Sequence, residues 1–350
     1  MMVGPVAARS LGLHPTWSVS FAPDDGVKQL WATDGGVFVL DGRNELSMLE
    51  TDTGLRQWRA FVADSTHRVL DLHLIAPLGL LVVLRADAIV TIDVTTGFPK
   101  GPLKGAVSSV QRLQWLARTG GVIYLDQIIY GGLGGEIAWQ SWNRGISTRA
   151  HRVGRRIAVA PVLTGTTVIA ASRSGHVSAL DAETGALLWT RPLLDTLEAA
   201  PVCSNDYVYV SGMDQHLRCL GLADNGRALW TALMKAPLRS SATLIGDIIY
   251  QQVPGTGLTA WAATPPNALD GVQHWTATDI TGDVLIRYDN KLLTWQANDG
   301  SLAVISPSSG SIEVKLDLPS GTRVQTSSID RGRVFVIGEN GRIESLIPAG

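Results

Sequence analysis

The residue types that most often carry chemistry are sparse in this 350-residue sequence and do not gather into motifs. Seven histidines are scattered along the chain. His176 and His216 occupy matching positions in neighbouring repeats, but packed sheets stand about 10 Å apart, too far for the two imidazoles to share a zinc ion. The sequence contains no G-x-S-x-G, no H-E-x-x-H and no phosphate-cradling glycine loop. We therefore predict no catalytic residue and no metal site.

Two cysteines, Cys203 and Cys219, are the remaining candidates for redox chemistry. They are predicted to fall on the first and third of three neighbouring strands, with the run YVYVSG between them. At about 4.8 Å per strand they would lie about 10 Å apart, which is beyond the reach of a disulfide. Asp residues such as Asp181 and Asp224 stand in turns, where a side chain bonding to its own turn explains them.

Arginine is the residue type whose pattern favours binding. Six arginines stand in loops just before the innermost strands of five of the eight repeats, and Glu198 interrupts the series. They are Arg68, Arg112, Arg155, Arg156, Arg239 and Arg323. If these loops ring one mouth of a channel, the guanidinium groups form a positive funnel that suits carboxylates or an acidic peptide. The alternative is that these side chains pair with neighbouring loops or face water.

The tryptophans divide into structural and functional candidates. Five stand on the fourth strand of a repeat, where each ring is expected to fill the wedge between neighbouring sheets rather than to stack on a ligand. These structural docking residues are Trp17, Trp58, Trp189, Trp230 and Trp275. Trp139 and Trp142 lie in the third strand of the least regular repeat, and we treat them as candidate contacts for a partner.

All these residues are positioned by a repeat that runs through the chain. Residues 172–189, SRSGHVSALDAETGALLW, read as short antiparallel strands joined by tight turns. A turn glycine is followed four residues later by Trp at Gly54, Gly185, Gly226 and Gly271, and the spacing persists without the aromatic residue at Gly97, Gly145 and Gly310. Hairpin turns recur about every 42 residues, near Asn44, Asp87, Gly135, Gly175, Gln215, Gly257, Gly300 and Gly341.

A period of this length predicts an all-β fold, an eight-bladed β-propeller of four-stranded antiparallel blades in a single domain, 1–350. The segment 14–22, HPTWSVSFA, reads as a fourth strand without its first three, whereas the last three runs of the chain lack a fourth. Placing Trp17–Phe21 beside Ile343–Ile347 closes blade 8 and hides strand edges.

Two insertions are predicted to offer additional surface. In blade 3 (about 108–153), DQIIYGGLGGE at 126–136 reads as a long connection between the second and third strands. In blade 6, AATPPNALDGVQ at 262–273 joins the third and fourth strands, and Pro265 and Pro266 preclude ladder pairing there. Connections of this kind are where a specialised surface is most easily added.

Composition and charge limit the partners and the location. A hydrophobic content of 45% with 17% charged residues indicates a folded protein, and a net charge of −2 provides no basic field for nucleic acid. The longest apolar run, 74–84, contains Pro77 and Gly79 and is too short to cross a bilayer. Residues 1–16 lack the apolar core of a signal peptide. We expect a cytoplasmic protein if the sequence is complete, and a periplasmic or envelope-associated one if a leader is missing.

The run SGHVSALDAETGALLW, together with APVCSNDYVYVSGMDQHLRCLGLADNGRALW after it, resembles the pyrroloquinoline-quinone-type (PQQ-type, quinoprotein-like) propeller repeat. In that family a Trp on each outer strand docks on the next blade. Size and blade count are similar to those of the propeller lipoproteins of the bacterial outer-membrane β-barrel assembly machinery. The quinone-dependent dehydrogenases of the family imply a Ca²⁺ site, a catalytic Asp and often a disulfide of adjacent cysteines. The separated cysteines and turn-bound Asp residues of this chain do not match that set.

The sequence therefore favours a non-catalytic, monomeric scaffold that binds a protein or peptide partner, without a cofactor and without nucleic acid. The resemblance implies a role in envelope assembly. The alternative is an enzyme or small-molecule binder that uses the central channel for a quinone or another ligand. A sensor propeller detached from a larger architecture is the third reading.

Overall fold

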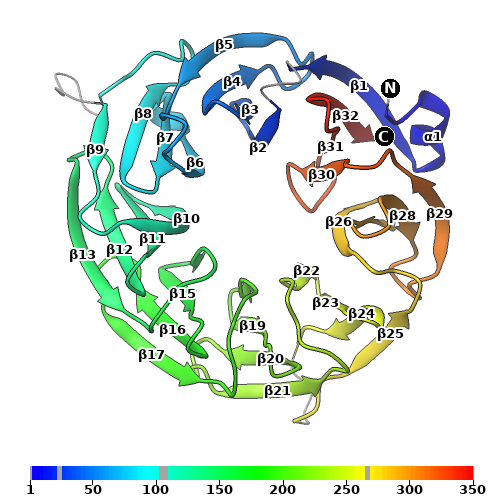
Figure 1. Ribbon diagram of the computed structural model, residues 1–350. Coiled ribbons are helices and arrows are strands. Elements are labelled where there is room, and N and C mark those ends of the chain that lie inside the picture. The colour runs from blue at the N-terminus through cyan, green and yellow to red at the C-terminus, as the bar shows by residue number, and fades with distance from the viewer. Residues whose placement is uncertain (1, 22–25, 102–108, 265–268, 350) are drawn as a thin grey trace. The chain divides into compact units, whose positions relative to one another are not determined.

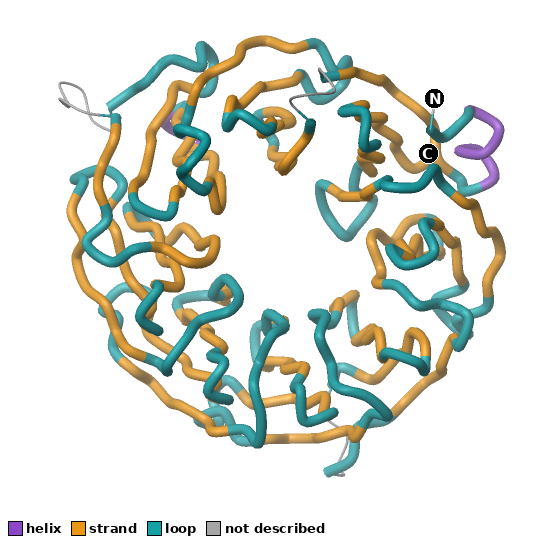
Figure 2. Tube along the Cα trace, in the orientation of Figure 1, coloured by secondary structure: helices purple, strands orange, loops and turns teal. Residues whose placement is uncertain are grey.

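The computed structural model describes residues 2–21, 26–101, 109–264 and 269–349, and every structural statement below refers to these residues. Their strands form eight four-stranded antiparallel sheets, and the strands joined by short loops are visible in Figures 1 and 2. The predicted fold class, an eight-bladed β-propeller, is confirmed. Pro265 and Pro266, on which the expected blade 6 insertion depends, lie outside the described residues.

One compact unit comprises Met1–Thr66, Val94–Phe98 and Trp275–Gly350. It contains helix α1 (Pro5–Ser10) and three blades. Blade 1 consists of β2 (Val27–Thr33), β3 (Gly36–Asp41), β4 (Glu45–Leu49) and β5 (Arg56–Phe61). Blade 7 consists of β26 (Asp283–Tyr288), β27 (Lys291–Gln296), β28 (Ser301–Ile305) and β29 (Ile312–Asp317). Blade 8 consists of β30 (Arg323–Thr326), β31 (Val334–Ile337), β32 (Arg342–Pro348) and β1 (Leu13–Ser20).

The second compact unit comprises His67–Asp93 and Pro99–His274. Blade 2 consists of β6 (Val69–Ile75), the 3₁₀ turn η1 (Ala76–Leu78), β7 (Leu80–Arg85), β8 (Ala88–Asp93) and β9 (Val110–Arg112). Blade 3 consists of β10 (Ala117–Tyr124), β11 (Gln127–Gly132), β12 (Glu136–Ser141) and β13 (Ile146–Arg152). Blade 4 consists of β14 (Val162–Thr164), β15 (Thr167–Ala171), β16 (His176–Asp181) and β17 (Leu187–Pro192), and blade 5 of β18 (Val202–Cys203), β19 (Tyr207–Ser211), β20 (His216–Gly221) and β21 (Ala228–Leu233). Blade 6 consists of β22 (Thr243–Ile245), β23 (Ile248–Val253), β24 (Gly257–Ala262) and β25 (Gln273–Ala277), which crosses the boundary between the units.

The tight turns between second and third strands require left-handed backbone at the positions that mark the repeat. Gly175 has φ 76°, and Asn44 and Gln215 reach φ 63° and 68° without being glycine. Glycine and, less readily, asparagine tolerate this region, which explains the small and polar residues at these turns. The strands on either side are almost fully buried in their centres, as in β3 and β15, so each hairpin lies within the core of its blade.

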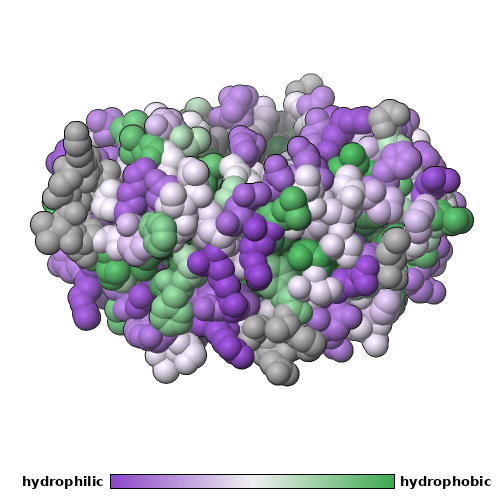
Figure 3. Space-filling view, turned by 90° about the horizontal axis from the view of Figure 1, so that it is seen from above, coloured by the Kyte–Doolittle hydropathy of each residue, from purple (hydrophilic) through white to green (hydrophobic). Residues whose placement is uncertain are grey.

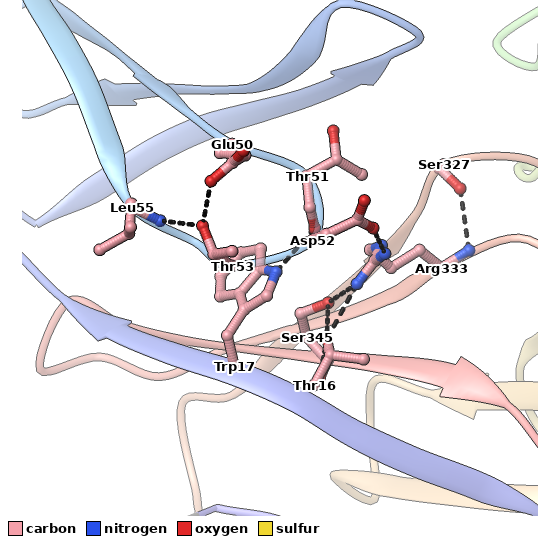
Figure 4. Close-up of polar contacts among 10 residues, drawn as sticks. All are labelled: Thr16, Trp17, Glu50, Thr51, Asp52, Thr53, Leu55, Ser327, Arg333 and Ser345. Carbon is pink, nitrogen blue, oxygen red and sulfur yellow. Dashed lines mark hydrogen bonds and ion pairs between the residues drawn. The ribbon is translucent and has the colours of Figure 1, made fainter.

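Blade 8 is closed by the two ends of the chain, as predicted. Strand β1 pairs antiparallel with β32, and Trp17 lies opposite Ser345. Arg333, on the loop before β31, fixes this pairing from one side: its guanidinium donates to Thr16 Oγ1 at 2.8 Å and to Ser345 Oγ at 2.9 Å. It also pairs with Asp52 of blade 1 at 2.9 Å (Figure 4). The nearly buried guanidinium thus has partners on three strands or turns.

Neighbouring blades are joined by a repeated contact, which we call the docking contact. A fourth-strand Trp lays its ring on the turn glycine of the next blade, and its indole N–H donates to a carbonyl of that turn. Trp17 donates to Thr51 at 2.7 Å (Figure 4), and Trp189 donates to Leu222 at 3.2 Å. A Cβ on the turn glycine would meet the ring at 2.6 to 2.8 Å in the pairs Trp17–Gly54, Trp58–Gly97, Trp189–Gly226, Trp230–Gly271 and Trp275–Gly310. In each of these five pairs, the absence of a side chain on the glycine leaves the space that the Trp ring fills.

A β-bulge precedes the docking residue in most blades. In blade 4 the register between β16 and β17 shifts next to Trp189, and in blade 5 the register between β20 and β21 shifts next to Trp230. The same shift precedes Trp17 in β1. A bulge bends the strand and increases its twist. We infer that this twist turns the docking ring out of its own sheet and toward the neighbouring blade.

Blades 2 and 3 make the docking contact with different residues. In blade 2, Gln111 of β9 donates to the carbonyl of Trp142 at 2.7 Å and covers Gly145 of the next turn. The fourth strand of blade 2 begins only at Val110, so Gly101, four residues after the turn glycine Gly97, does not hold the docking position. In blade 3 the Trp stands on the third strand rather than the fourth: Trp139 of β12 donates to the Ala182 carbonyl at 2.9 Å.

Arg149 takes the position that Trp occupies in other blades. It lies opposite Trp139 in the sheet and its side chain covers Gly185, so the Trp and its cross-strand neighbour together fill the wedge.

The expected long connection in blade 3, 126–136, is wrong. Residues Gln127–Gly132 form strand β11, almost entirely buried, and only 133–135 turn. Blade 3 also begins at Ala117 rather than near 108, because Val110–Arg112 complete blade 2. The glycines that suggested a loop are in the strand because neighbours approach closely: a Cβ on Gly131 would lie 2.6 Å from Ile157. Blade 3 therefore has no insertion at this place.

Deleting residues 1–22 should abolish a single cooperative melt or cause aggregation. The deletion removes β1, exposes the edge of β32 and leaves Arg333 without Thr16. Calorimetry and size-exclusion chromatography would measure the outcome. A truncated protein that stays monodisperse and melts like the parent would contradict the role of β1 in closing blade 8.

Replacing Trp189 by Ala should lower the free energy of unfolding by about 3 to 5 kcal/mol. The ring is 8% exposed, and its removal opens a cavity against Gly226 and breaks the bond to the Leu222 carbonyl. Urea denaturation followed by circular dichroism would measure the change. A loss below about 1 kcal/mol would show that the contact between blades 4 and 5 does not depend on the Trp189 ring.

Gly226→Ala should destabilise the protein more than Gly165→Ala, which is a matched control. Both glycines have positive φ, 69° and 55°, so both variants carry backbone strain of about 1 to 2 kcal/mol. Only at Gly226 does the new Cβ meet neighbours, the Trp189 ring at 2.6 Å and the flexible Arg191 side chain at 2.9 Å, and overpacking should add about 1 to 3 kcal/mol. The excess should fall in the Trp189→Ala background, and equal costs in both backgrounds would exclude a clash with the ring.

Candidate functional site

An arginine cluster in the second unit is the candidate site. Arg68 immediately precedes β6, Arg118 is the second residue of β10, Arg156 lies in the loop before β14, and Arg173 lies in the turn between β15 and β16. A recurring backbone bond joins these two kinds of loop: Arg173 N–H donates to the Arg156 carbonyl at 2.8 Å, and the N–H of Ala86 donates to the Arg68 carbonyl at 2.9 Å. The loop entering a blade therefore lies against the second turn of that blade.

The guanidinium groups of this cluster act on one another. Burial, followed by the charges of Arg156, Arg173 and Arg68, lowers the pKa of Arg118 from its usual value. Charges of one sign must lie close together to have this effect. Within the described parts of the chain, no carboxylate forms an ion pair with Arg68, Arg118 or Arg156, so their positive potential faces outward uncompensated.

Glu198 is an acidic residue that pairs with two arginines at the cluster. Its carboxylate lies 3.4 Å from Arg173 and 3.3 Å from Arg239, and thus bridges blade 4 to the loop that enters blade 6. One negative charge offsets only part of the surrounding positive charge. The Arg239 side chain is 67% exposed, so this pair contributes little to stability, but it extends the cluster along the loops.

The other arginines of the predicted funnel lie in different settings. Arg155 is exposed beside Arg156. Arg112 is an exposed residue at the end of β9. Arg323 begins β30 in the first unit, where it donates to the carbonyls of Lys28 (3.1 Å) and Val27. The structure therefore brings Arg68 and Arg156 together, with Arg239 linked through Glu198.

Trp139 and Trp142 are both buried, 0% and 5% exposed. Trp139 fills the wedge between blades 3 and 4, and Trp142 offers its carbonyl to Gln111. Neither side chain forms an exposed surface, so neither is carried into the function proposed below.

Arg118 and Arg173 were missed by the sequence reasoning. That reasoning searched only the loops before first strands, whereas Arg173 lies in a second turn and Arg118 inside a strand. The signal was present in the run SRSG, which places an arginine in a tight turn. What the sequence does not show is the backbone bond that brings this turn against Arg156.

The thiols offer no reactive group. Cys203 and Cys219 are unbonded cysteines on the first and third strands of blade 5, as expected, and burial raises the pKa of each to about 12. A thiol with such a pKa is a poor nucleophile near neutrality. Within the described segments, no three His, Cys, Asp or Glu side chains are grouped to hold a metal ion.

The exposed apolar side chains are dispersed. Phe61, Leu187 and Leu233, all on fourth strands, are examples that are 63%, 43% and 69% exposed. Figure 3 shows hydrophobic residues interspersed with hydrophilic ones on the face in view. Single exposed apolar residues are normal on folded proteins. None of the described helices has the length and apolar character needed to span a membrane.

Comparison with known proteins places these features in a family context. Residues 120–265 match a family model described as "Outer membrane protein assembly factor BamB". The BamB of Legionella pneumophila (strain Paris) is 23% identical over 204 residues, which cover 53% of this chain and 50% of the relative. The match therefore spans about half the length of that curated relative.

Solved structures show the same fold along nearly the whole chain. The crystal structure of BamB from Moraxella catarrhalis superposes with a TM-score of 0.72 at 17% identity, covering 95% of this chain and 97% of that one. The computationally designed Ika8 protein gives 0.73 at 14% identity, covering 95% and 99%. The Pan2 WD40 domain of Neurospora crassa gives 0.59 at 9%, covering 97% and 96%. At these identities the likeness concerns the fold alone.

The docking contacts, the four-stranded blades and the match of residues 120–265 agree with the resemblance seen in the sequence. The chain is an eight-bladed β-propeller whose repeats resemble the PQQ type, and its residues 120–265 are similar to BamB.

Proposed function

We propose that this protein is a non-catalytic scaffold that binds an acidic segment of a protein or peptide partner at the arginine cluster. The observation that supports it is the set of guanidinium groups of Arg68, Arg118 and Arg156, which have no ion-pair partner among the described residues and repel one another. Guanidinium groups bind carboxylates through paired hydrogen bonds. An acidic segment laid across these loops would supply the missing negative charge.

The chemistry of the cluster favours a peptide over a nucleic acid. The net charge of the chain is −2, so the positive potential is local and does not extend into the broad basic field that binds a phosphate backbone. The cluster combines arginines in the loops of blades 2 and 4 with Arg118 in strand β10 of blade 3, and Arg239 lies beyond them in the loop that enters blade 6. Such an extended row suits a chain with several carboxylates better than a compact ligand.

The similarity to BamB supports the biological setting of the proposal. The relatives are named for outer-membrane protein assembly, and we propose that the partner of this chain also acts in assembly at the cell envelope. The scaffold would act as a monomer and as one domain, because the docking contacts make the blades a firm support for the binding loops. Catalysis is not proposed, since the buried thiols are poor nucleophiles.

Reversing two charges of the cluster, Arg118→Glu with Arg156→Glu, should weaken binding of an acidic peptide roughly tenfold or more. The probe is a fluorescein-labelled peptide with four Glu-Val repeats, followed by anisotropy, and its Gln-Val counterpart should bind far more weakly. Binding to the parent should also fall as salt is raised from about 50 to about 300 mM. Arg144→Glu, a 70% exposed arginine outside the cluster, is the matched control.

Affinity capture from extracts of the native host tests the same proposal with natural partners. Proteins retained by the parent and by Arg144→Glu should be lost with the double reversal, while all three proteins melt alike. Equal binding of the acidic and the Gln-Val peptide, or capture that survives the double reversal, would refute a role for the cluster.

A further inference from the structure

A cavity of about 390 Å³ lies within the first unit, between α1, β1 and the start of β32. Figure 1 shows α1 beside β1. Pro5 and Arg9 of α1, residues 14–18 of β1, and Arg342 with Glu344 of β32 line the cavity. Its volume falls in the range of small-molecule sites, about 300 to 1,000 Å³.

The cavity arises from the way blade 8 is built. Its third and fourth strands, β32 and β1, belong to opposite parts of the sequence, so no hairpin turn joins them as in the other blades. Helix α1 packs at this corner instead: Ala8 and Leu11 are fully buried, and the Tyr288 hydroxyl donates to the Leu11 carbonyl. The helix covers the core at this corner, and the cavity lies between the helix and the paired strands, toward the start of β32.

Glu344 does not make the cavity acidic, because its carboxylate is already engaged. The N–H groups of Met2 and Val3 donate to its two oxygens at 2.6 and 2.8 Å. Arg342 Nε lies 3.0 Å from the same carboxylate. The side chain is only 4% exposed. This buried pair is therefore a structural clamp on the N-terminal segment.

Arg9, His14 and Ser18 are the exposed polar residues of the lining that are left for a ligand. Within the described segments, neither Arg9 nor His14 has an ion-pair partner or a side-chain hydrogen bond. A guanidinium and an imidazole N–H both donate hydrogen bonds to a carboxylate. Together with the neutralised Arg342–Glu344 pair, they give the cavity a net positive charge.

The rest of the lining determines the shape of the ligand. Pro5 and Pro15 provide apolar surface, whereas the Trp17 ring is packed on Gly54 and its indole N–H is bonded to Thr51. Strand addition to β1 is disfavoured here, because Pro15 lacks an N–H and the bulge between Pro15 and Trp17 breaks the edge. Recognition must therefore come from side chains rather than from backbone pairing.

From these observations we infer that the cavity binds a compact monocarboxylate with an apolar body, whose carboxylate is held by Arg9 and His14. The carboxylate could come from a free organic acid or from the C-terminus of a peptide, and the two sources present the same chemistry. The site is separate from the arginine cluster and does not depend on the scaffold function.

Isothermal titration calorimetry with four probes tests the site. The acids are 3-phenylpropionate and the tripeptide acetyl-Ala-Ala-Phe with a free C-terminus, and each is paired with its amide. At least one acid should bind, and its amide should bind about tenfold more weakly or not at all. Binding of one acid and not the other identifies the source.

The variant Arg9→Gln should weaken the binding acid about tenfold, and His14→Ala should weaken it further in combination. Arg56→Gln, an exposed arginine of the same unit that does not line the cavity, should bind like the parent. Thermal melts confirm that the variants fold, which is expected because Arg9 has no structural partner among the described residues. Absence of binding by both acids, equal binding of acid and amide, or full affinity in Arg9→Gln would overturn the inference.

Discussion

The fold depends on the contact between a fourth-strand ring and the turn glycine of the next blade. A four-stranded sheet has two faces and cannot bury both by itself, so each blade needs a neighbour that fits closely. The ring supplies the area: at about 25 cal/mol per Å², burying 150 to 250 Å² stabilises each seam by at most about 4 to 6 kcal/mol. The glycine supplies the space, because a Cβ on Gly54 or Gly226 would overlap the ring. The repeated spacing of glycine and tryptophan in the sequence follows from this contact.

The contacts between neighbouring blades keep the same arrangement while the residues that make them differ. Gln111 reaches the turn carbonyl of blade 3 with an amide instead of an indole. In blade 3 the ring stands on β12 and the aliphatic stem of Arg149 covers Gly185. At blade 8 the helix α1 occupies the corner where a hairpin would stand. In each case a side chain or the helix fills the space between blades, and a hydrogen-bond donor pairs with a backbone carbonyl that would otherwise be buried without a partner.

These substitutions explain where the sequence predicts the structure and where it does not. The period, the turns and the pairing of β1 with β32 follow from residue types alone, since glycine at positive φ and alternating apolar residues have few other uses. The segment 126–136 was misread because Gly131 and Gly132 resemble a loop, although they lie in β11 where Ile157 and Glu136 approach too closely for a side chain. The arginines before first strands were visible in the sequence. Arg118 and Arg173 were not, because their proximity depends on which loops touch.

Arginines that stabilise the fold and arginines of the cluster differ in whether a carboxylate pairs with them. Where arginine stabilises the fold, it is paired: Arg218 with Asp214 in blade 5, and Arg333 with Asp52 at the closure of blade 8. In the cluster, by contrast, burial and then the charges of Arg156, Arg173 and Arg68 lower the pKa of Arg118, and the repulsion among these groups opposes folding. A carboxylate at any of these positions would relieve it, as Glu198 does for Arg173 and Arg239. The docking contacts do not involve these arginines, so the fold tolerates the repulsion, and an acidic partner of the kind proposed above would reduce it.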